Sequence, residues 1–266
     1  MAGSPLATRS SLLKDLRGLG IAAGDVVMVH ASVRNVGPIL GGVTTLVQAL
    51  LDAVGDEGTL VAYVDWELGY DPDAVDPSLA DEIPAFDKRI ARAVRDNGIL
   101  PEVVRTWPGS VRGDNPDASI AAIGSRAAWL CADHPLSYGY GENSPYAKLV
   151  AIGAKVLMLG APLDTITLLH HAEHLAKIPG KRLIHYRRKL LVCGAPRWVD
   201  IEEFDTSYPV VDGMPDDHFT QIALTALDAG YGRSGVVGAA QSYIFDADPL
   251  HSIAVHWLEN WCPPSA

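Results

Sequence analysis

Three histidines and one glutamate stand together in the stretch His170-His171-Ala172-Glu173-His174. His170 and Glu173 are three residues apart, so on a helix their side chains share one face and can reach each other. An imidazole beside a carboxylate that orients it is the arrangement used in general-base catalysis. The spacing therefore permits a base with an orienting carboxylate.

Two other interpretations of this stretch stay open from the spacing alone. The histidines can be hydrogen-bonded side chains at the edge of the core, without any role in chemistry. His170 and His174 also have the i, i+4 spacing that chelates zinc. A third ligand would then come from Asp164, His185 or Asp205. The order H-H-A-E-H differs from the H-E-x-x-H of zinc proteases, because the glutamate stands in another place.

The element before the histidines determines where they lie. Residues 155–159 are the most regular buried strand that the sequence predicts, and the strand ends at Gly160. A helix is predicted over residues 165–176, with Asp164 at its N-cap position. Because ligands of open α/β sheets bind at the carboxyl ends of the strands, we expect a site at this edge.

The rest of the chain alternates strand and helix signals, which predicts an α/β fold. No repeat, low-complexity tract or linker interrupts it, so we expect a single domain over residues 1–266 with a central sheet flanked by helices. Helices are expected over 10–19, 44–54, 98–105, 144–151, 219–229 and 253–261, and strands over 26–30, 58–64, 119–123, 183–186, 190–193, 198–201 and 236–245.

A second candidate site is the loop His30–Gly37, which follows the first predicted strand. Its backbone N–H groups and Arg34 can bind an anion such as a pyrophosphate, and the stretch Arg105–Arg112 can add charge to the same anion. An ordinary connecting loop is an equally good interpretation. The chain has no G-K-[ST] and no G-x-S-x-G, so nucleotide hydrolysis and a serine nucleophile elbow have no support.

Charge and composition narrow the partners. The chain has 21 lysines and arginines against 32 aspartates and glutamates, a net charge of −11. Nucleic acid is therefore not an expected partner, since binding it requires a basic stripe. An acidic surface attracts cationic ligands, although solubility alone also explains it. The apolar runs are far shorter than the ~18 residues of a membrane helix, so no membrane partner is expected.

Three cysteines, Cys131, Cys193 and Cys262, occur without C-x-x-C spacing. This pattern argues against a disulfide framework and against a structural zinc site. The first residues lack a basic region followed by an apolar one, so no secretion signal is predicted. We therefore expect a cytoplasmic protein with reduced thiols.

Four stretches together resemble the aminoglycoside 3-N-acetyltransferases. They are V-H-A-S-V-R-N-V-G (29–37), R-T-W-P-G-S (105–110), N-P-D-A-S (115–119) and G-A-P-L-D-T-I-T-L-L-H-H-A-E (160–173). The resemblance covers nearly the whole chain. It implies the mixed α/β sheet of the antibiotic N-acetyltransferase type, which is distinct from the GCN5 type. It also implies that acetyl passes from acetyl-CoA to the 3-amino group of 2-deoxystreptamine aminoglycosides, which confers antibiotic resistance.

The resemblance assigns roles to individual residues. It implies that His170 is the catalytic histidine and that Glu173 supports it. The residues that it implies for acetyl-CoA are Ser32, Val33, Val36, Gly37, Ser110 and Arg112. Those for the cationic drug are Asp164, Glu203 and Asp205, with Trp66 and Glu67 added from the acidic loop. No metal is expected, and a homodimer is left open.

One part of the chain departs from the family pattern. Many members have R-S-A-H-P where this chain has R-G-D-N-P, so Gly113 and Asn115 replace a serine and a histidine. No role for those two side chains carries over, and the range of substrates is left open.

In the mechanism that we expect, both substrates bind together and no cysteine nucleophile is needed. His170 takes the proton as the 3-amine attacks, and Glu173 fixes the ring's tautomer and stabilises the imidazolium. A function without catalysis is the alternative. The protein would then be a regulator that binds acyl-CoA or a polyamine, and it would bind acetyl-CoA without releasing the CoA thiol.

Overall fold

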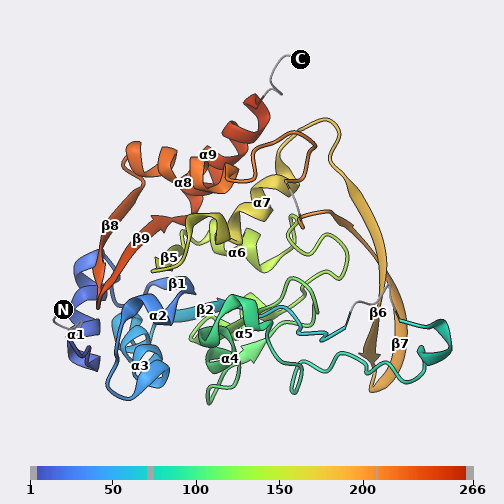
Figure 1. Ribbon diagram of the computed structural model, residues 1–266, viewed down its shortest axis with the longest axis horizontal. Coiled ribbons are helices and arrows are strands. Elements are labelled where there is room, and N and C mark those ends of the chain that lie inside the picture. Colours follow the sequence, from blue (N-terminus) through green and yellow to red (C-terminus); the bar gives the residue numbers. More distant parts are fainter. Residues whose placement is uncertain (1–4, 71–74, 208, 262–266) are drawn as a thin grey trace.

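A seven-stranded mixed sheet forms the centre of the molecule (Figure 1). The computed structural model describes residues 5–70, 75–207 and 209–261. The strand order is β3-β4-β2-β1-β5-β9-β8, with β1 parallel to both β2 and β5 and the other pairs antiparallel. The strands are β1 (Val26–Ala31), β2 (Thr59–Tyr63), β3 (Val111–Arg112), β4 (Ile120–Gly124), β5 (Lys155–Leu159), β8 (Gly232–Val237) and β9 (Ala240–Asp246).

Helices cover both faces of this sheet, which explains why its central strands are apolar runs rather than alternating ones. One face carries α1 (Arg9–Leu19), α3 (Gly42–Val54) and α4 (Ile99–Arg105). The opposite face carries α5 (Ala127–Cys131), α6 (Pro145–Ala151), α7 (Leu168–Leu175), α8 (His218–Asp228) and α9 (Ala247–Asn260). The expected α/β fold with a mixed sheet flanked by helices is confirmed.

A long hairpin of β6 (Leu183–Val192) and β7 (Ala195–Phe204) forms a separate two-stranded sheet beside the main body (Figure 1). Its turn is Cys193-Gly194, and both residues have positive φ, 50° and 80°, as the tightest hairpin turns require. The prediction of three short strands here was wrong. Residues 187–189 are polar and interrupt the apolar pattern, but they continue β6 across the hairpin.

Three other boundaries differ from the prediction. α1 begins at Arg9, one residue before the predicted start, because the Thr8 side chain caps the helix by accepting from Ser11 N. The stretch 236–245 is two strands, since the chain turns at Gly238 with φ 61°. Asp164 is not the N-cap of a helix; it lies in a 3₁₀ turn, Leu163–Thr165, and α7 begins only at Leu168.

The carboxyl ends of β1 and β5 lie side by side at one edge of the sheet. The two strands are parallel neighbours, but the chain leaves them toward opposite faces. After β1 it continues through the short helix α2 (Val33–Val36) to α3, whereas after β5 it turns into α7 on the other face. In α/β sheets, ligands bind outside the carboxyl ends of the strands at which such a reversal occurs.

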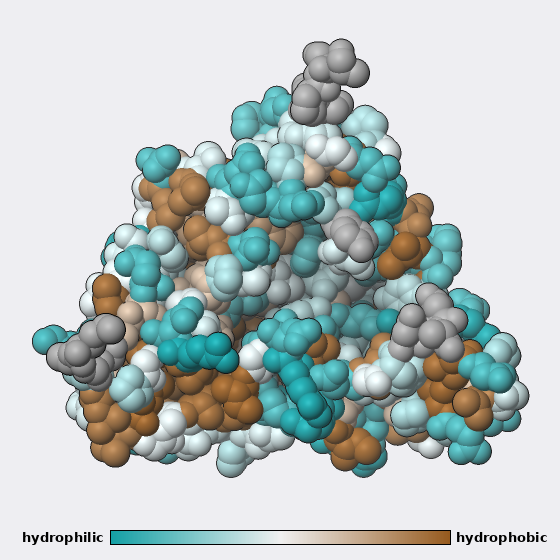
Figure 2. Space-filling model, in the orientation of Figure 1, coloured by the Kyte–Doolittle hydropathy of each residue, from teal (hydrophilic) through white to brown (hydrophobic). Residues whose placement is uncertain are grey.

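The surface seen in Figure 2 is largely hydrophilic, with hydrophobic patches over the α1–α3 corner and near the tip of the β6–β7 hairpin. Among the described residues, no helix combines the length and the apolar character needed to cross a bilayer.

Gly160 is the residue at which β5, the α2 segment and β9 come closest together. Its φ is 64°, and a Cβ there would lie 2.9 Å from Ala240 Cβ and 3.0 Å from Asn35 Cβ. Gly153 has nearly the same φ, 63°, with nothing within 4 Å of its added Cβ. The two glycines therefore separate the cost of backbone strain from the cost of crowding.

We expect Gly160→Ala to lower the free energy of unfolding by about 2–3 kcal/mol, because it adds a steric clash to backbone strain. The matched variant Gly153→Ala should cost about 1 kcal/mol, from strain alone. Urea unfolding of both variants and the parent protein measures the difference. Equal losses in the two variants would contradict the close approach at the strand ends.

Candidate active site

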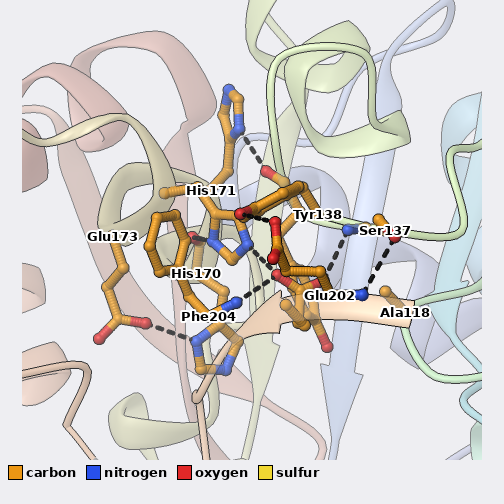
Figure 3. Close-up of polar contacts among 12 residues, drawn as sticks. Ala118, Ser137, Tyr138, His170, His171, Glu173, Glu202 and Phe204 are labelled. Atoms are coloured by element: carbon orange, nitrogen blue, oxygen red, sulfur yellow. Dashed lines mark hydrogen bonds and ion pairs between the residues drawn. The ribbon is translucent and has the colours of Figure 1, made fainter. Parts of the chain in front are cut away.

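The first turns of α7 bring His170 and Glu173 together. The His170 Nδ1 and Glu173 Oε2 atoms are 2.7 Å apart (Figure 3). Glu173 is buried, whereas 21% of the His170 side chain is exposed. The predicted contact between the two side chains is therefore present, with the imidazole on the accessible side of the carboxylate.

The other oxygen of Glu173 is bonded to His218, the first residue of α8, with 2.9 Å between Oε1 and His218 Nε2. Burial alone would raise the pKa of Glu173, but the hydrogen bonds from the two imidazoles outweigh it and lower the pKa to about 2. An ionised carboxylate only accepts hydrogen bonds. His170 Nδ1 must therefore carry the proton, which leaves a lone pair on Nε2 when the ring is neutral.

Aromatic side chains fix the orientation of the His170 ring. The ring centroid lies 5.1 Å from that of Tyr140 and 5.0 Å from that of Phe219, at tilted and edge-on angles. Tyr140 is itself held by a hydrogen bond of 3.0 Å between its hydroxyl and that of Tyr63. The His170 ring is thus positioned by contacts with two aromatic rings as well as by Glu173.

His30, at the carboxyl end of β1, is a further histidine near this pair. Burial, with a smaller effect of the His170 charge, lowers its pKa to about 4, so the ring is neutral at physiological pH. Its buried Nε2 has no hydrogen-bond partner within the described ranges. From the sequence, His30 is predicted only as the first residue of the loop His30–Gly37.

His174 is bonded to a carboxylate of its own. Its Nε2 lies 2.5 Å from Glu203 Oε1, and its Nδ1 lies 2.8 Å from the His170 carbonyl oxygen. Glu203 also accepts from the backbone N–H of Gly139 and of Phe204. His170 and His174 thus point to two different carboxylates, and no cluster of three or more metal-ligating side chains occurs in residues 5–70, 75–207 and 209–261.

A cleft of about 840 Å³ lies between the β6–β7 hairpin and the edge of the main sheet. Its lining includes the end of β2, the segment 115–118 and both strands of the hairpin. Tyr140 lines this cleft and also packs against His170, so His170 lies next to the cleft. Carboxylates that line it are Asp65, Asp76, Asp117 and Glu203.

Asp65 and Asp117 are the two carboxylates with raised pKa values in this cleft. Burial, reinforced by the neighbouring Asp117, raises the pKa of Asp65 to about 7. Burial also raises the pKa of Asp117, although Arg188 opposes the shift from 2.9 Å. Asp117 Oδ2 is buried without a hydrogen-bond partner among the described residues. Both carboxylates would gain from a cation placed between them.

The basic side chains of the cleft are already bonded within the protein. Arg188 pairs with Asp117, and Arg187 lies 3.1 Å from Asp200. Lys189 donates to the carbonyl oxygen of Asp81 at 2.8 Å. These cations therefore stabilise the hairpin and the loop beside it.

Of the five residues expected to bind the drug, two line the cleft and three do not. Trp66 and Glu203 line the cleft. Glu67 instead accepts from the backbone N–H of Arg95 at 2.9 Å, and Asp205 pairs with Arg182 at 3.4 Å. Asp164 is exposed in the turn between β5 and α7.

The residues expected to bind acetyl-CoA lie in two places. Ser32, Val33, Val36 and Gly37 form α2 and its ends, beside Gly160, whose carbonyl oxygen accepts from Asn35 Nδ2 at 2.8 Å. Ser110 and Arg112 lie at β3, which two strands separate from β1.

Arg112 differs from the expectation that it supplies charge to an anion at the surface. It is buried, and its guanidinium donates to the carbonyl oxygens of Ala91 and Val64 and lies over the Phe86 ring. Burial lowers its pKa to about 10. The side chain ties the segment before α4 to the end of β2.

The departure at Gly113 and Asn115 has a structural explanation. Asn115 is buried, accepts from the backbone N–H of Asp117 and Ala118, and donates to the Pro135 carbonyl oxygen. It therefore shapes the cleft wall at residues 115–118. An added Cβ at Gly113 would lie 3.4 Å from His134 Nδ1, a buried atom with no partner in the described chain.

Comparison with known proteins decides the family. Residues 28–259 match the family model described as aminoglycoside 3-N-acetyltransferase. The chain belongs to this family. Aminoglycoside N(3)-acetyltransferase III of Pseudomonas aeruginosa is 47% identical over 95% of this chain and 94% of that protein. The corresponding enzyme IX of Micromonospora chalcea is 43% identical over 97% and 95%. The chain is therefore an acetyltransferase of the predicted family.

Solved structures of the acetyltransferase family share the fold over the full length. AAC-IIIb in a binary complex with CoASH superposes with a TM-score of 0.93 and 50% identity, over 98% of this chain and 100% of that chain. AAC-VIa bound to sisomicin gives a TM-score of 0.90 and 40% identity, over 96% and 98%.

Several site residues of this acetyltransferase were not predicted. His218 and Tyr140 contact the His170–Glu173 pair from other parts of the chain. Asp65 and Asp117 lie in the cleft, but the sequence showed them only as two of many acidic residues. No local spacing connects these side chains to His170, so only the fold could bring them together.

The Glu173 carboxylate should stabilise the fold in a pH-dependent way. Its pKa is lowered in the folded protein, so its contribution is complete above about pH 4.5 and is lost as the pH falls toward about 2. We expect Glu173→Gln to lower the melting temperature by roughly 5 °C at pH 7. The difference from the parent protein should shrink between pH 5 and pH 3.

Thermal unfolding across this pH range measures the effect, with the exposed Glu142→Gln as the matched control. A difference between parent and Glu173→Gln that stays constant with pH would contradict the bonded, ionised state of Glu173.

Proposed function

We propose that this protein transfers acetyl from acetyl-CoA to the 3-amino group of 2-deoxystreptamine aminoglycosides, with His170 as general base and Glu173 as its support. The observation that carries the proposal is the His170–Glu173 pair, oriented by aromatic packing next to a cleft with several carboxylates. The proposal includes cytoplasmic action and antibiotic resistance as the consequence of acetylation.

The proposed step is a direct transfer. The 3-amino nitrogen attacks the thioester carbonyl carbon, so that a C–N bond forms and the C–S bond breaks. The proton of the attacking nitrogen passes to His170 Nε2 and then to the CoA sulfur, which leaves as the thiol. Glu173 accepts from Nδ1 throughout and stabilises the imidazolium that forms. A positioned general base typically contributes ~10²–10⁴-fold to such a step.

The cleft suits a polycation. Asp65, Asp117 and Glu203 offer carboxylates to the drug's ammonium groups, and Trp66 offers an apolar wall. The sisomicin complex of AAC-VIa supports an aminoglycoside as the ligand of this fold. Asp164, Glu67 and Asp205 remain proposed drug-binding residues from the family resemblance. Glu67 is already bonded to the backbone of Arg95 and Asp205 to Arg182, so we propose that these two act by positioning their partners.

The α2 segment suits the acyl donor. Ser32, Val33, Val36 and Gly37 lie at the carboxyl end of β1, beside Gly160 at the end of β5, and ligands of α/β sheets bind at such strand ends. The complex of AAC-IIIb with CoASH supports CoA as the ligand of this fold. Ser110 remains a proposed CoA contact, since its buried hydroxyl has no partner among the described residues. Arg112 remains a proposed residue for acetyl-CoA from the family resemblance, and from its buried position it would act by fixing the segment that contains Ser110.

The direct test is release of CoA thiol from acetyl-CoA by the purified protein, with and without gentamicin or kanamycin. Drug-dependent release, with mass spectrometry and NMR placing the acetyl group on the 3-amine, is the expected result. Binding of acetyl-CoA without drug-dependent release would instead favour a binding protein and contradict the proposal.

Replacing the base should remove most of the activity. We expect His170→Ala to lower kcat at least 100-fold, in line with the loss of general-base catalysis. The melting temperature should also fall, because the buried Glu173 Oε2 loses its hydrogen-bond partner, so kcat is measured well below the unfolding transition. The matched control is the exposed His256→Ala, on α9 and away from the cleft. Steady-state kinetics that show unchanged kcat in His170→Ala would exclude the residue as the base.

Asp65 should give drug binding a specific pH dependence. Because its pKa is raised to about 7, the carboxyl is largely neutral at pH 6 and ionised at pH 8 in the free enzyme. We expect Asp65→Asn to raise the KM for the drug several-fold at pH 8 and only slightly at pH 6. The ratio of mutant to parent KM cancels the titration of the drug itself. A ratio independent of pH would contradict ionic binding at Asp65.

A further inference from the structure

His218 contacts the catalytic carboxylate from a different helix. It begins α8, only 7% of its side chain is exposed, and its Nε2 is bonded to Glu173 Oε1. His170 takes the other oxygen of the same carboxylate. Glu173 thus links the proposed base to a second, buried imidazole that lies 45 residues further along the chain.

Both ring nitrogens of His218 face hydrogen-bond acceptors. Nε2 lies 2.9 Å from the Glu173 carboxylate, and Nδ1 lies 2.9 Å from the carbonyl oxygen of Pro215. Neither an ionised carboxylate nor a carbonyl oxygen can donate. A neutral imidazole has one donor only, so it would direct a lone pair at one of these oxygens. Two good contacts require a proton on each nitrogen, which makes the ring a cation.

We propose that His218 is a positioning residue that stays protonated, balances the charge of Glu173, and so keeps His170 neutral and able to accept the substrate's proton. This inference rests on the proposed role of His170 as the base. The residue itself touches neither of the substrates in the proposed reaction and acts through Glu173.

The charge of His218 matters because Glu173 is buried. An uncompensated buried carboxylate strongly favours a positive charge beside it, and His170 is the neighbour that could take one. A protonated His170 has no lone pair for the attacking amine. When His218 is positive, the Glu173–His218 pair has no net charge. Glu173 then orients His170 through its hydrogen bond without favouring a second positive charge on the His170 ring.

The other charged groups around the pair have partners of their own. On α7, His174 is bonded to Glu203. After α7, Lys181 donates to the His174 carbonyl oxygen at 2.9 Å; burial lowers its pKa, and Glu173 partly opposes that shift. On α9, Glu259 accepts from Lys177 N, while Trp257 packs near His218. From β1, His30 faces His170, and burial keeps it neutral.

Two substitutions separate the charge of His218 from its hydrogen bond. His218→Gln can keep an N–H directed at Glu173 but carries no charge, whereas His218→Phe keeps a ring and loses both. We expect the acidic limb of the pH profile of kcat/KM to move up by about one pH unit in both variants, as for a lost charge in a partly buried site. His218→Gln should approach the parent rate at high pH, and His218→Phe should stay slower.

The exposed His256→Gln on α9 is the control and should leave the acidic limb unchanged. A limb in His218→Gln that coincides with that of the parent protein would overturn the inference, because a purely structural role would change rate or stability without moving the limb.

A measurement on the unmodified protein keeps the test independent of folding defects and of activity. Side-chain ¹⁵N NMR of the resting protein should show both nitrogens of His218 protonated at pH 7.5. A neutral His218 ring at that pH would overturn the inference even if acetyl transfer is confirmed. Absence of drug-dependent transfer with a cationic His218 would instead contradict the proposed function and leave the charge assignment standing.

Discussion

The site depends on keeping one carboxylate, that of Glu173, ionised inside the core. Burial of a carboxylate costs several kcal/mol unless hydrogen bonds and opposite charge compensate for it. Here α7 supplies His170 one turn earlier, and α8 supplies His218 from the opposite side. Both oxygens are therefore bonded to imidazole nitrogens. The same contacts that stabilise the buried charge fix the tautomer of His170, so stability and orientation of the base have one physical origin.

The sheet determines where the proposed base lies relative to the proposed substrate sites. β1 and β5 are parallel neighbours whose following segments, α2 and α7, run to opposite faces of the sheet. Gly160 permits the close approach of these segments. The β6–β7 hairpin forms another wall of the cleft, which Asp65 and Asp117 also line. The basic side chains of the hairpin are bonded to other groups of the protein, among them Asp117 itself. The proposed base and the cleft lined by carboxylates are thus built by separate elements around Tyr140.

The sequence predicted the parts that depend on local spacing. The His170–Glu173 contact follows from three residues on one helix, and residues 155–159 form β5 as expected. The bond from His218 to Glu173 could not be predicted, because it depends on how α8 packs against α7. Asp164 was misplaced as a helix cap because a 3₁₀ turn intervenes before Leu168. The long hairpin was divided wrongly because a strand exposed along much of its length lacks the apolar pattern of a core strand.

The central claim is that the hydrogen bond to Glu173 fixes the ring proton of His170 on Nδ1, so that Nε2 is the atom that takes the substrate's proton. The most direct measurement is ¹⁵N NMR of the His170 ring in the resting protein at pH 7.5, assigned by comparison with His170→Gln. We predict that Nδ1 of the His170 ring is protonated and that Nε2 is not. A proton on Nε2, in either the other neutral tautomer or the charged ring, would contradict it.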